Sequence, residues 1–193
     1  MDITSLLGSD LGKQALHGIT QKTEATEEET SSVLSAATPV LLGMLKKNSE
    51  TPEGASGLLG ALNKHDGSVL NNLGGFLNAN DTSDGQAILG HILGGQKGQV
   101  ENAISAKTGV STSKVTHILA LLAPIILGKL GSQANSNSVS SGDGLSNILG
   151  GLLGGADSSS IGGGILSSIL GGSGQQGGAG GIGSVLGGLF GKK

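Results

Sequence analysis

Apolar residues recur at intervals of three and four along most of the chain, which is the spacing that places side chains on one face of an α-helix. In the central stretch 57–95 these positions fall into three groups: Leu58, Leu59 and Leu62; Val69, Leu70, Leu73, Phe76 and Leu77; Ile88, Leu89, Ile92 and Leu93. Stretches such as Asp66-Gly67 separate the groups. Runs of β-branched or aromatic residues with a period of two do not occur. The pattern therefore predicts an all-α fold, with about six or seven short helices in residues 1–132.

Two segments of this region resemble each other. Residues 15–47 align without gaps with residues 100–132 at an offset of 85, with eight identities in 33 positions. The shared residues include a proline, Pro39 or Pro124, and a glycine, Gly43 or Gly128. We interpret the two segments as copies of one unit, a helix, a turn and a longer helix. With weaker flanking similarity the copies span 3–47 and 92–132, and connecting helices occupy 53–95.

Helix-start signals precede the longer helix of each copy. Thr26 and Glu29 form the pattern of a capping box, and Ser111 is the expected N-cap of the second copy. Because proline removes a backbone hydrogen bond, we expect each long helix to kink, or to end and restart, at Pro39 or Pro124. The glycine four residues later predicts a place where another backbone packs closely.

Three stretches resemble the YidB-like family of bacterial proteins of unknown function: DGSVLNNLGGFL, DGQAILGHILGG and TGVSTSKVTHILALLAPIILGKL. The resemblance covers roughly residues 1–132, and residues 84–94 are its most specific part. It implies a small, all-helical bacterial domain, expected in the cytoplasm. It implies no established activity, so no catalytic residue is carried over from it.

Glycine marks a boundary near residues 131–133. Of the 38 glycines, 21 lie in residues 131–193. The glycines of this region do not recur at every third position, as they would in collagen. We therefore predict a helical repeat domain in residues 1–132, followed by a Gly/Ser-rich tail in 133–193.

The tail carries three helical stripes, in residues 145–153, 161–170 and 182–190. Their apolar positions are Leu145, Ile148, Leu149, Leu152 and Leu153; Ile165, Leu166, Ile169 and Leu170; and Ile182, Val185, Leu186, Leu189 and Phe190. Helices this short and this rich in glycine are unstable alone, so each stripe needs a partner surface.

Several partners are open for the stripes. The leading hypothesis is a non-enzymatic self-association or scaffold protein, in which the stripes of different copies pack together into a homo-oligomer or larger assembly. The alternatives are docking on the chain's own domain, a tail without a fixed partner, and binding to a membrane interface. In the last case Phe190 would insert and Lys192 and Lys193 would meet anionic lipid.

Charge and composition argue against several other functions. The chain has no cysteine and a net charge of −3, and its basic residues are all lysine. Residues 106–119 have the pattern of a helix-turn-helix, which makes nucleic-acid binding a remote alternative. Glu27, Glu28 and Glu29 occupy the equivalent place in the first copy, where they would repel a phosphate backbone. We expect a cytoplasmic protein, because the start of the chain lacks a signal-peptide pattern and no long uninterrupted apolar run occurs.

Candidate chemistry is sparse. The nucleophile-elbow and phosphate-loop motifs are absent, and the four histidines stand apart from one another. The stretch NANDTSDG resembles a calcium loop in composition but lacks the ordered ligands. The sequence thus predicts no enzyme and no catalytic, cofactor-binding or metal-binding residue. His91, flanked by apolar residues, is a weak candidate for a functional histidine.

Overall fold

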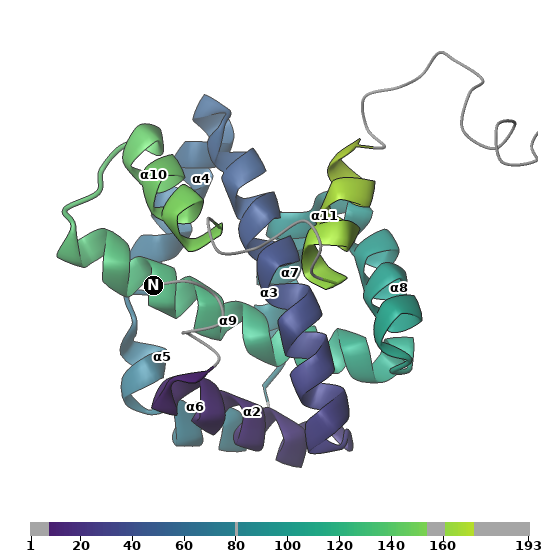
Figure 1. The fold of residues 1–193 in the computed structure, drawn as a ribbon. Coiled ribbons are helices and arrows are strands. Elements are labelled where there is room, and N and C mark those ends of the chain that lie inside the picture. The colour runs from purple at the N-terminus through teal and green to yellow at the C-terminus, as the bar shows by residue number, and fades with distance from the viewer. Residues whose placement is uncertain (1–7, 80, 154–160, 172–193) are drawn as a thin grey trace, which may run out of the picture.

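The computed structural model describes residues 8–79, 81–153 and 161–171, and every regular element in these ranges is a helix (Figure 1). The prediction of an all-α fold is confirmed. The helices are α2 (Asp10–Thr23), α3 (Glu27–Ser49), α4 (Pro52–Lys64), α5 (Ser68–Asn71), α6 (Leu73–Ala79), α7 (Ser83–Leu93), the 3₁₀ turn η1 (Gly94–Gln96), α8 (Lys97–Thr108), α9 (Thr112–Ser136), α10 (Gly142–Leu153) and α11 (Ile161–Gly171).

The two longest helices, α3 and α9, form the centre of the fold. They pack on each other, α2 and α8 each contact both of them, and the remaining helices surround them (Figure 1). Where their first turns meet, Lys114 Nζ of α9 donates to Glu29 Oε2 at 2.9 Å and to Oε1 at 3.1 Å. Glu29 and Lys114 occupy the same position in the two aligned segments, at the offset of 85. The inference of a duplicated unit still rests on the sequence, but the two segments adopt the same order of helices.

Both prolines lie inside continuous helices. α3 contains Pro39, α9 contains Pro124, and neither helix ends or restarts there. Of the two outcomes expected at proline, a kink or a break with a restart, the break is therefore wrong. Both prolines are buried between packed helices, and burial of the surrounding apolar turns compensates for the hydrogen bond that proline removes.

The helix starts differ in how they are capped. The capping box is confirmed: the Thr26 hydroxyl accepts from the Glu29 backbone N–H at 3.1 Å, and the Glu29 carboxylate accepts from the Thr26 N–H at 2.7 Å. Ser111 is the N-cap residue of α9, as expected, but its side chain makes no capping hydrogen bond. Glu29 thus serves both the cap of α3 and the contact with α9.

The first two stripes of the tail are helices that pack on the rest of the chain. α10 lies mainly against α3 and also contacts α4, whereas α11 lies against α3 and α8. The compositional boundary near residue 132 falls inside α9, which continues to Ser136. The change in glycine content is therefore not a boundary between a packed region and a free tail.

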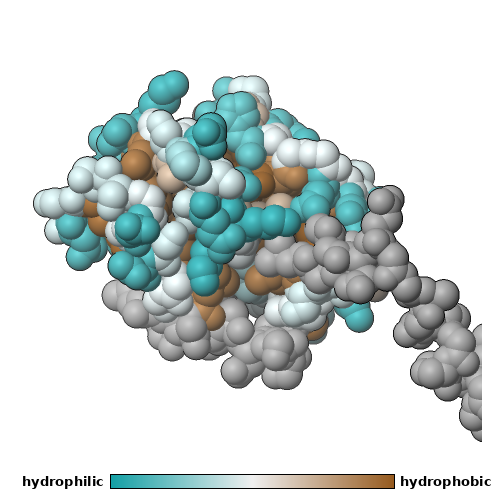
Figure 2. All heavy atoms as spheres, turned by 90° about the horizontal axis from the view of Figure 1, so that it is seen from above, coloured by the Kyte–Doolittle hydropathy of each residue, from teal (hydrophilic) through white to brown (hydrophobic). Residues whose placement is uncertain are grey.

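Apolar side chains are largely enclosed by these contacts. α9 is long and apolar enough to cross a membrane, but 78% of its most apolar window is buried inside the chain, as in the core helix of a soluble protein. Seen from above, hydrophilic residues cover much of the surface and hydrophobic ones show between them (Figure 2). Among the described residues, Ile161 is the large hydrophobic residue that is exposed.

Replacing Gly85 of α7 by alanine is expected to destabilise the protein by about 1–3 kcal/mol, because the new Cβ would overlap the Ala120 carbonyl oxygen of α9. Gly90→Ala on the same helix is the matched control. It has no atom within 4 Å to meet, and it should stabilise by up to about 1 kcal/mol. Urea unfolding followed by far-UV circular dichroism measures both. Equal effects of the two substitutions would contradict the packing of α7 on α9.

Acid should weaken the contact between α3 and α9. The hydrogen bond from Lys114 lowers the pKa of Glu29 below its ordinary value of 4.5, and the Thr26 backbone N–H adds to this. Because the folded-state pKa is the lower one, the stabilisation is present above pH 4.5 and is lost as the pH falls through the folded-state value. The midpoint of thermal unfolding should be higher for wild type than for Glu29→Gln near neutral pH. In strong acid the two midpoints should become equal. A gap that is constant with pH would refute the assignment.

Candidate functional site

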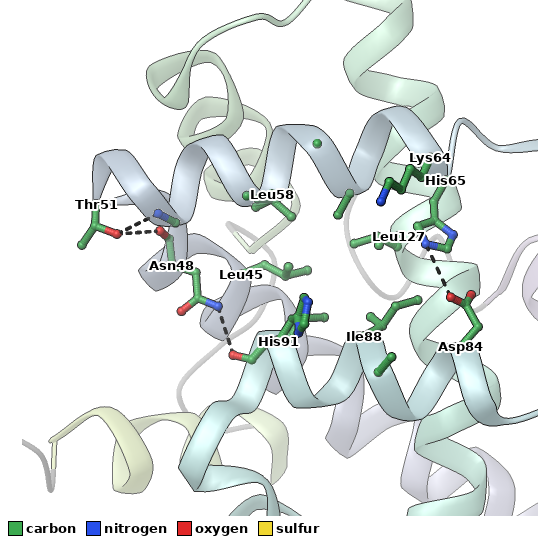
Figure 3. Close-up of a pocket in the computed structure, with 16 residues that line it drawn as sticks. Leu45, Asn48, Thr51, Leu58, Lys64, His65, Asp84, Ile88, His91 and Leu127 are labelled. Carbon is green, nitrogen blue, oxygen red and sulfur yellow. Dashed lines mark hydrogen bonds and ion pairs between the residues drawn. The ribbon is translucent and has the colours of Figure 1, made fainter.

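A groove separates α4 from α7 and has a volume of about 830 Å³. α4 and α7 form its two walls (Figure 3), and Leu45 of α3 and Leu127 of α9 also line it. These two leucines belong to the buried core, so the central helices fix the base of the groove. The groove is thus lined by residues of α3, α4, α7 and α9, which are far apart in the sequence.

The α4 wall is built from small residues. Gly54, Gly57, Gly60 and Ala61 line the groove, spaced three residues apart or adjacent, so they share one face of the helix. Gly54 is required by the fold, because a Cβ there would overlap the backbone oxygen of Asn48. Gly57 and Gly60 have no atom within 4 Å of a Cβ position. The wall therefore offers an open stretch of backbone to whatever enters the groove.

The α7 wall has an apolar face with a polar edge. Ile88 and Ile92 are buried beside the groove, whereas Ala87 and His91 are exposed on its rim. Before α7, Asp81 accepts hydrogen bonds from the Ser83 hydroxyl and backbone N–H, which lower the pKa of its carboxyl group. Asp81 therefore stabilises the start of the helix, the ordinary role of an aspartate at this position.

Polar groups stand at both ends of the groove (Figure 3). At one end His65 Nε2 lies 3.9 Å from Asp84 Oδ1, and the aspartate side chain is half exposed to solvent. At the other end Asn48 Nδ2 donates to the Ile92 carbonyl at 3.0 Å, which ties α3 to the end of α7. Thr51 Oγ1 accepts from the Gly54 N–H and caps α4. An apolar middle between polar ends suits an amphipathic occupant.

The groove offers little for bond-breaking chemistry. The Thr51 hydroxyl is engaged in the helix cap, and His65 meets Asp84 at one end of the groove, whereas His91 lies on its rim. Within residues 8–79, 81–153 and 161–171, no group of three histidine, cysteine or acidic residues could hold a metal ion.

A family model described as "Bacterial protein of unknown function (DUF937)" matches residues 5–133. The chain belongs to this family. The YidB-like resemblance of the sequence is consistent with it. Searches of the curated proteins and of the solved structures give no match. The DUF937 match ends before α10 and α11, so in this chain two helices outside the matched region pack on α3 within it.

The histidines of this DUF937 chain have separate environments. His91 lies on the rim of the groove and is exposed. His17 contacts Gln21 at 3.0 Å on the surface of α2. Sequence reasoning missed the approach of His65 to Asp84. The two residues come from the end of one helix and the start of another, so no local spacing could reveal the pair.

The first stripe is buried against α3 and α4. Leu145, Leu149 and Leu152 are buried, and Ile148 and Leu153 are half-buried against the same core. While α10 stays docked, contacts within the chain cover these side chains, which is the alternative of docking on the chain's own domain. Gly150 and Gly151, on the opposite face, have no atom near a Cβ position.

The second stripe is docked in the same way. Ile165 and Ile169 are buried, and Leu166 packs into the space that Gly43 leaves on α3. These residues are likewise occupied within the chain, for the same reason. The neighbour of Gly43 is thus a side chain rather than the backbone expected from the sequence. At Gly128 the Val69 side chain is nearest, but the backbone of Gly67 also lies close, as expected. The Leu170 side chain and the third stripe, Ile182, Val185, Leu186, Leu189 and Phe190, lie outside the described residues.

The helix-turn-helix candidate is part of the packed core. Gly109, with φ of +74°, forms the turn between α8 and α9, and Val110 after it is buried. Of the two lysines in residues 106–119, Lys114 is paired with Glu29 and is not free for phosphate groups. Glu29, one of the three glutamates expected to repel a phosphate backbone, is therefore the direct partner of Lys114.

Alanine substitutions should separate the open glycines of the groove from the structural one. Gly57→Ala and Gly60→Ala should each stabilise the protein by up to about 1 kcal/mol, because alanine favours helix and meets no neighbour there. Gly54→Ala should destabilise it, because its Cβ would overlap the Asn48 oxygen. Thermal unfolding compares the three variants. A loss of stability at position 57 or 60 would mean that the wall is already covered.

Proposed function

We propose that the protein is a non-enzymatic bacterial assembly protein, in which the stripe in residues 182–190 of one copy packs as a helix into the groove between α4 and α7 of another. The groove carries the proposal, since it is a helix-lined surface with an apolar middle, next to the helices that bind the first two stripes. The cytoplasm remains the proposed compartment.

The behaviour of the first two stripes supports this function. α10 and α11 share with residues 182–190 the pattern of apolar residues three and four apart, with glycine and serine between them. Both are helices whose apolar faces are buried on α3. The third stripe has the same pattern, and by the same physics it should become helical on a complementary apolar surface.

The shape of the groove also fits such an occupant. Two helices bring their axes to a distance set by the side chains between them, so glycine and alanine walls permit a close approach. Gly57, Gly60 and Ala87 present almost no side-chain bulk to the groove. An incoming leucine or isoleucine could then reach the apolar residues between α4 and α7.

Membrane binding is the second candidate function, favoured by Lys192 and Lys193, which directly follow the third stripe. Two adjacent cations beside a phenylalanine are suited to an anionic lipid surface. Assembly is favoured over membrane binding because the first two stripes bind helices and contain no lysine.

Sedimentation velocity tests the assembly. Interference optics are needed, because the chain has no tryptophan or tyrosine. Wild type should sediment as a larger species than Leu186→Ser or Gly57→Leu, which alter the stripe and the groove respectively. Gly90→Leu is the matched control: it adds the same side chain at an exposed glycine of α7 that does not line the groove, and should leave the assembly unchanged. A wild type that sediments as a monomer would refute the function.

The membrane alternative makes a different prediction. If the third stripe binds lipid, wild type should co-sediment with vesicles containing anionic lipid, and the variant Lys192→Gln/Lys193→Gln should do so much less, because it lacks the attraction of two charges. Gly57→Leu should retain lipid binding, since the groove would take no part. Absence of the protein from the vesicle pellet would remove this alternative.

A further inference from the structure

Two helices in different halves of the chain have nearly the same sequence. Residues 85–95 read GQAILGHILGG, and residues 162–172 read GGGILSSILGG. Seven of the eleven positions are identical: Gly85/Gly162, Ile88/Ile165, Leu89/Leu166, Ile92/Ile169, Leu93/Leu170, Gly94/Gly171 and Gly95/Gly172. The first stretch spans most of α7 and the second spans α11. α7 follows the first aligned segment after α4, α5 and α6, and α11 follows the second after α10. We call α2 to α7 the first half of the chain and α8 to α11 the second half.

The two helices dock on opposite halves. α7 belongs to the half that contains α3, but it packs mainly on α9. α11 belongs to the half that contains α9, but it packs mainly on α3. α7 and α11 thus each pack mainly on the long helix of the other half.

The close contacts of the two docked helices correspond as well. The backbone of α7 at Gly85 lies against the Ala120 carbonyl of α9, and that of α11 at Gly162 lies against the Ala36 carbonyl and Pro39 of α3. After the offset of 85 is applied, Ala120 corresponds to position 35, one residue from Ala36. The same glycine therefore meets nearly the same place on the two long helices.

We infer that α7 and α11 are equivalent docking helices exchanged between the two halves, and that the α11 site on α3 also accepts α11 from a second copy of the chain. The inference rests on the proposed function, because assembly through the groove is what raises the local concentration of α11 from other copies. It adds a second interaction surface, formed by Ala36, Pro39 and Gly43 of α3, and assigns a partner to it.

Exchange between copies preserves the contacts. The helix–helix interface is the same whether α11 comes from its own chain or from another, so the balance depends on the local concentration of each source. The connection from α10 to α11, residues 154–160, has the sequence GADSSS after Gly154, without a proline or a large apolar residue. Linking two interacting elements through a short stretch of the same chain gives an effective concentration in roughly the mM range. In an assembly held together by the groove, the α11 helices of neighbouring copies would be present at a local concentration similar to that of the chain's own α11.

Cysteine pairs can detect the exchange because the natural chain has no cysteine. One chain carries Gly43→Cys with Leu166→Ala, which makes room for the new side chain so that its own α11 can remain docked. The other chain carries Leu166→Cys. Since Leu166 Cγ lies 3.1 Å from the Cβ position of residue 43, the two cysteines are close enough for a disulfide when α11 of the second chain docks on the first.

The full-length chains are co-expressed with different tags, oxidised, and analysed for a disulfide between them. We expect this disulfide to form several-fold more than with the matched control Gly164→Cys, whose position on α11 has no atom within 4 Å. Adding Leu186→Ser to both chains should lower the yield, because it removes the clustering that favours exchange.

A second measurement keeps the result interpretable. A single chain with Gly43→Cys and Leu166→Cys should form an internal disulfide, which shows that the cysteines fit and can be oxidised. If this disulfide forms but the two separate chains yield no more than the Gly164→Cys control, the exchange is refuted. A monomeric wild type in sedimentation velocity would refute the groove assembly instead, so the two failures are distinguishable.

Discussion

Helix backbones in this protein approach one another directly at glycine residues, and the arrangement of the helices depends on these contacts. Gly85 brings α7 against α9, Gly131 brings α9 against the end of α4 at His65, and Gly162 brings α11 against α3. The core has few large side chains: the chain has two phenylalanines, no tryptophan and no tyrosine. Leucine, isoleucine, valine and alanine fill less space, so the helices must come closer to reach the density of a normal protein interior.

Glycine makes these helices weak by themselves, and docking compensates. A glycine in a helix interior costs about 1 kcal/mol relative to alanine, and a helix of eleven or twelve residues is marginal in water even when it is alanine-rich. α10 and α11 are nevertheless helical, because Leu145, Leu149, Ile165 and Ile169 are buried on α3. Their folding is therefore tied to the presence of α3. A segment that is helical only when docked can bind any apolar helix surface similar to that of α3. This property links the packing of the chain to its proposed assembly.

Local patterns in the sequence predicted the helices well and their contacts poorly. The period of three to four gave the all-α fold, and Thr26 with Glu29 gave a real capping box, because both signals act within a single helix. The stripes at 145–153 and 161–170 were correctly predicted as helical, but their partner was not. Many apolar surfaces can bury a leucine stripe, and its spacing does not distinguish α3 of the same chain from another copy.

The groove could not be predicted for a related reason. Its walls come from residues 54–64 and 84–92, and its base comes from Leu45 and Leu127, so it exists only after α3 and α9 have packed. The approach of His65 to Asp84 depends on the same assembly. Pro39 and Pro124 show the opposite case: a local rule allows a break at each proline, but both lie buried inside continuous helices.

Open glycines alone would be weak support for a binding surface in this chain. Gly90, Gly150, Gly151 and Gly164 also have no atom near a Cβ position, and they lie on outward faces. Gly57 and Gly60 differ because they line a groove whose opposite wall and base are apolar. At an outward glycine an alanine would merely strengthen the helix, whereas at these two positions a side chain would also occupy the space that an incoming helix needs. The combination of missing side chains and an enclosed apolar surface is what makes the groove between α4 and α7 a site.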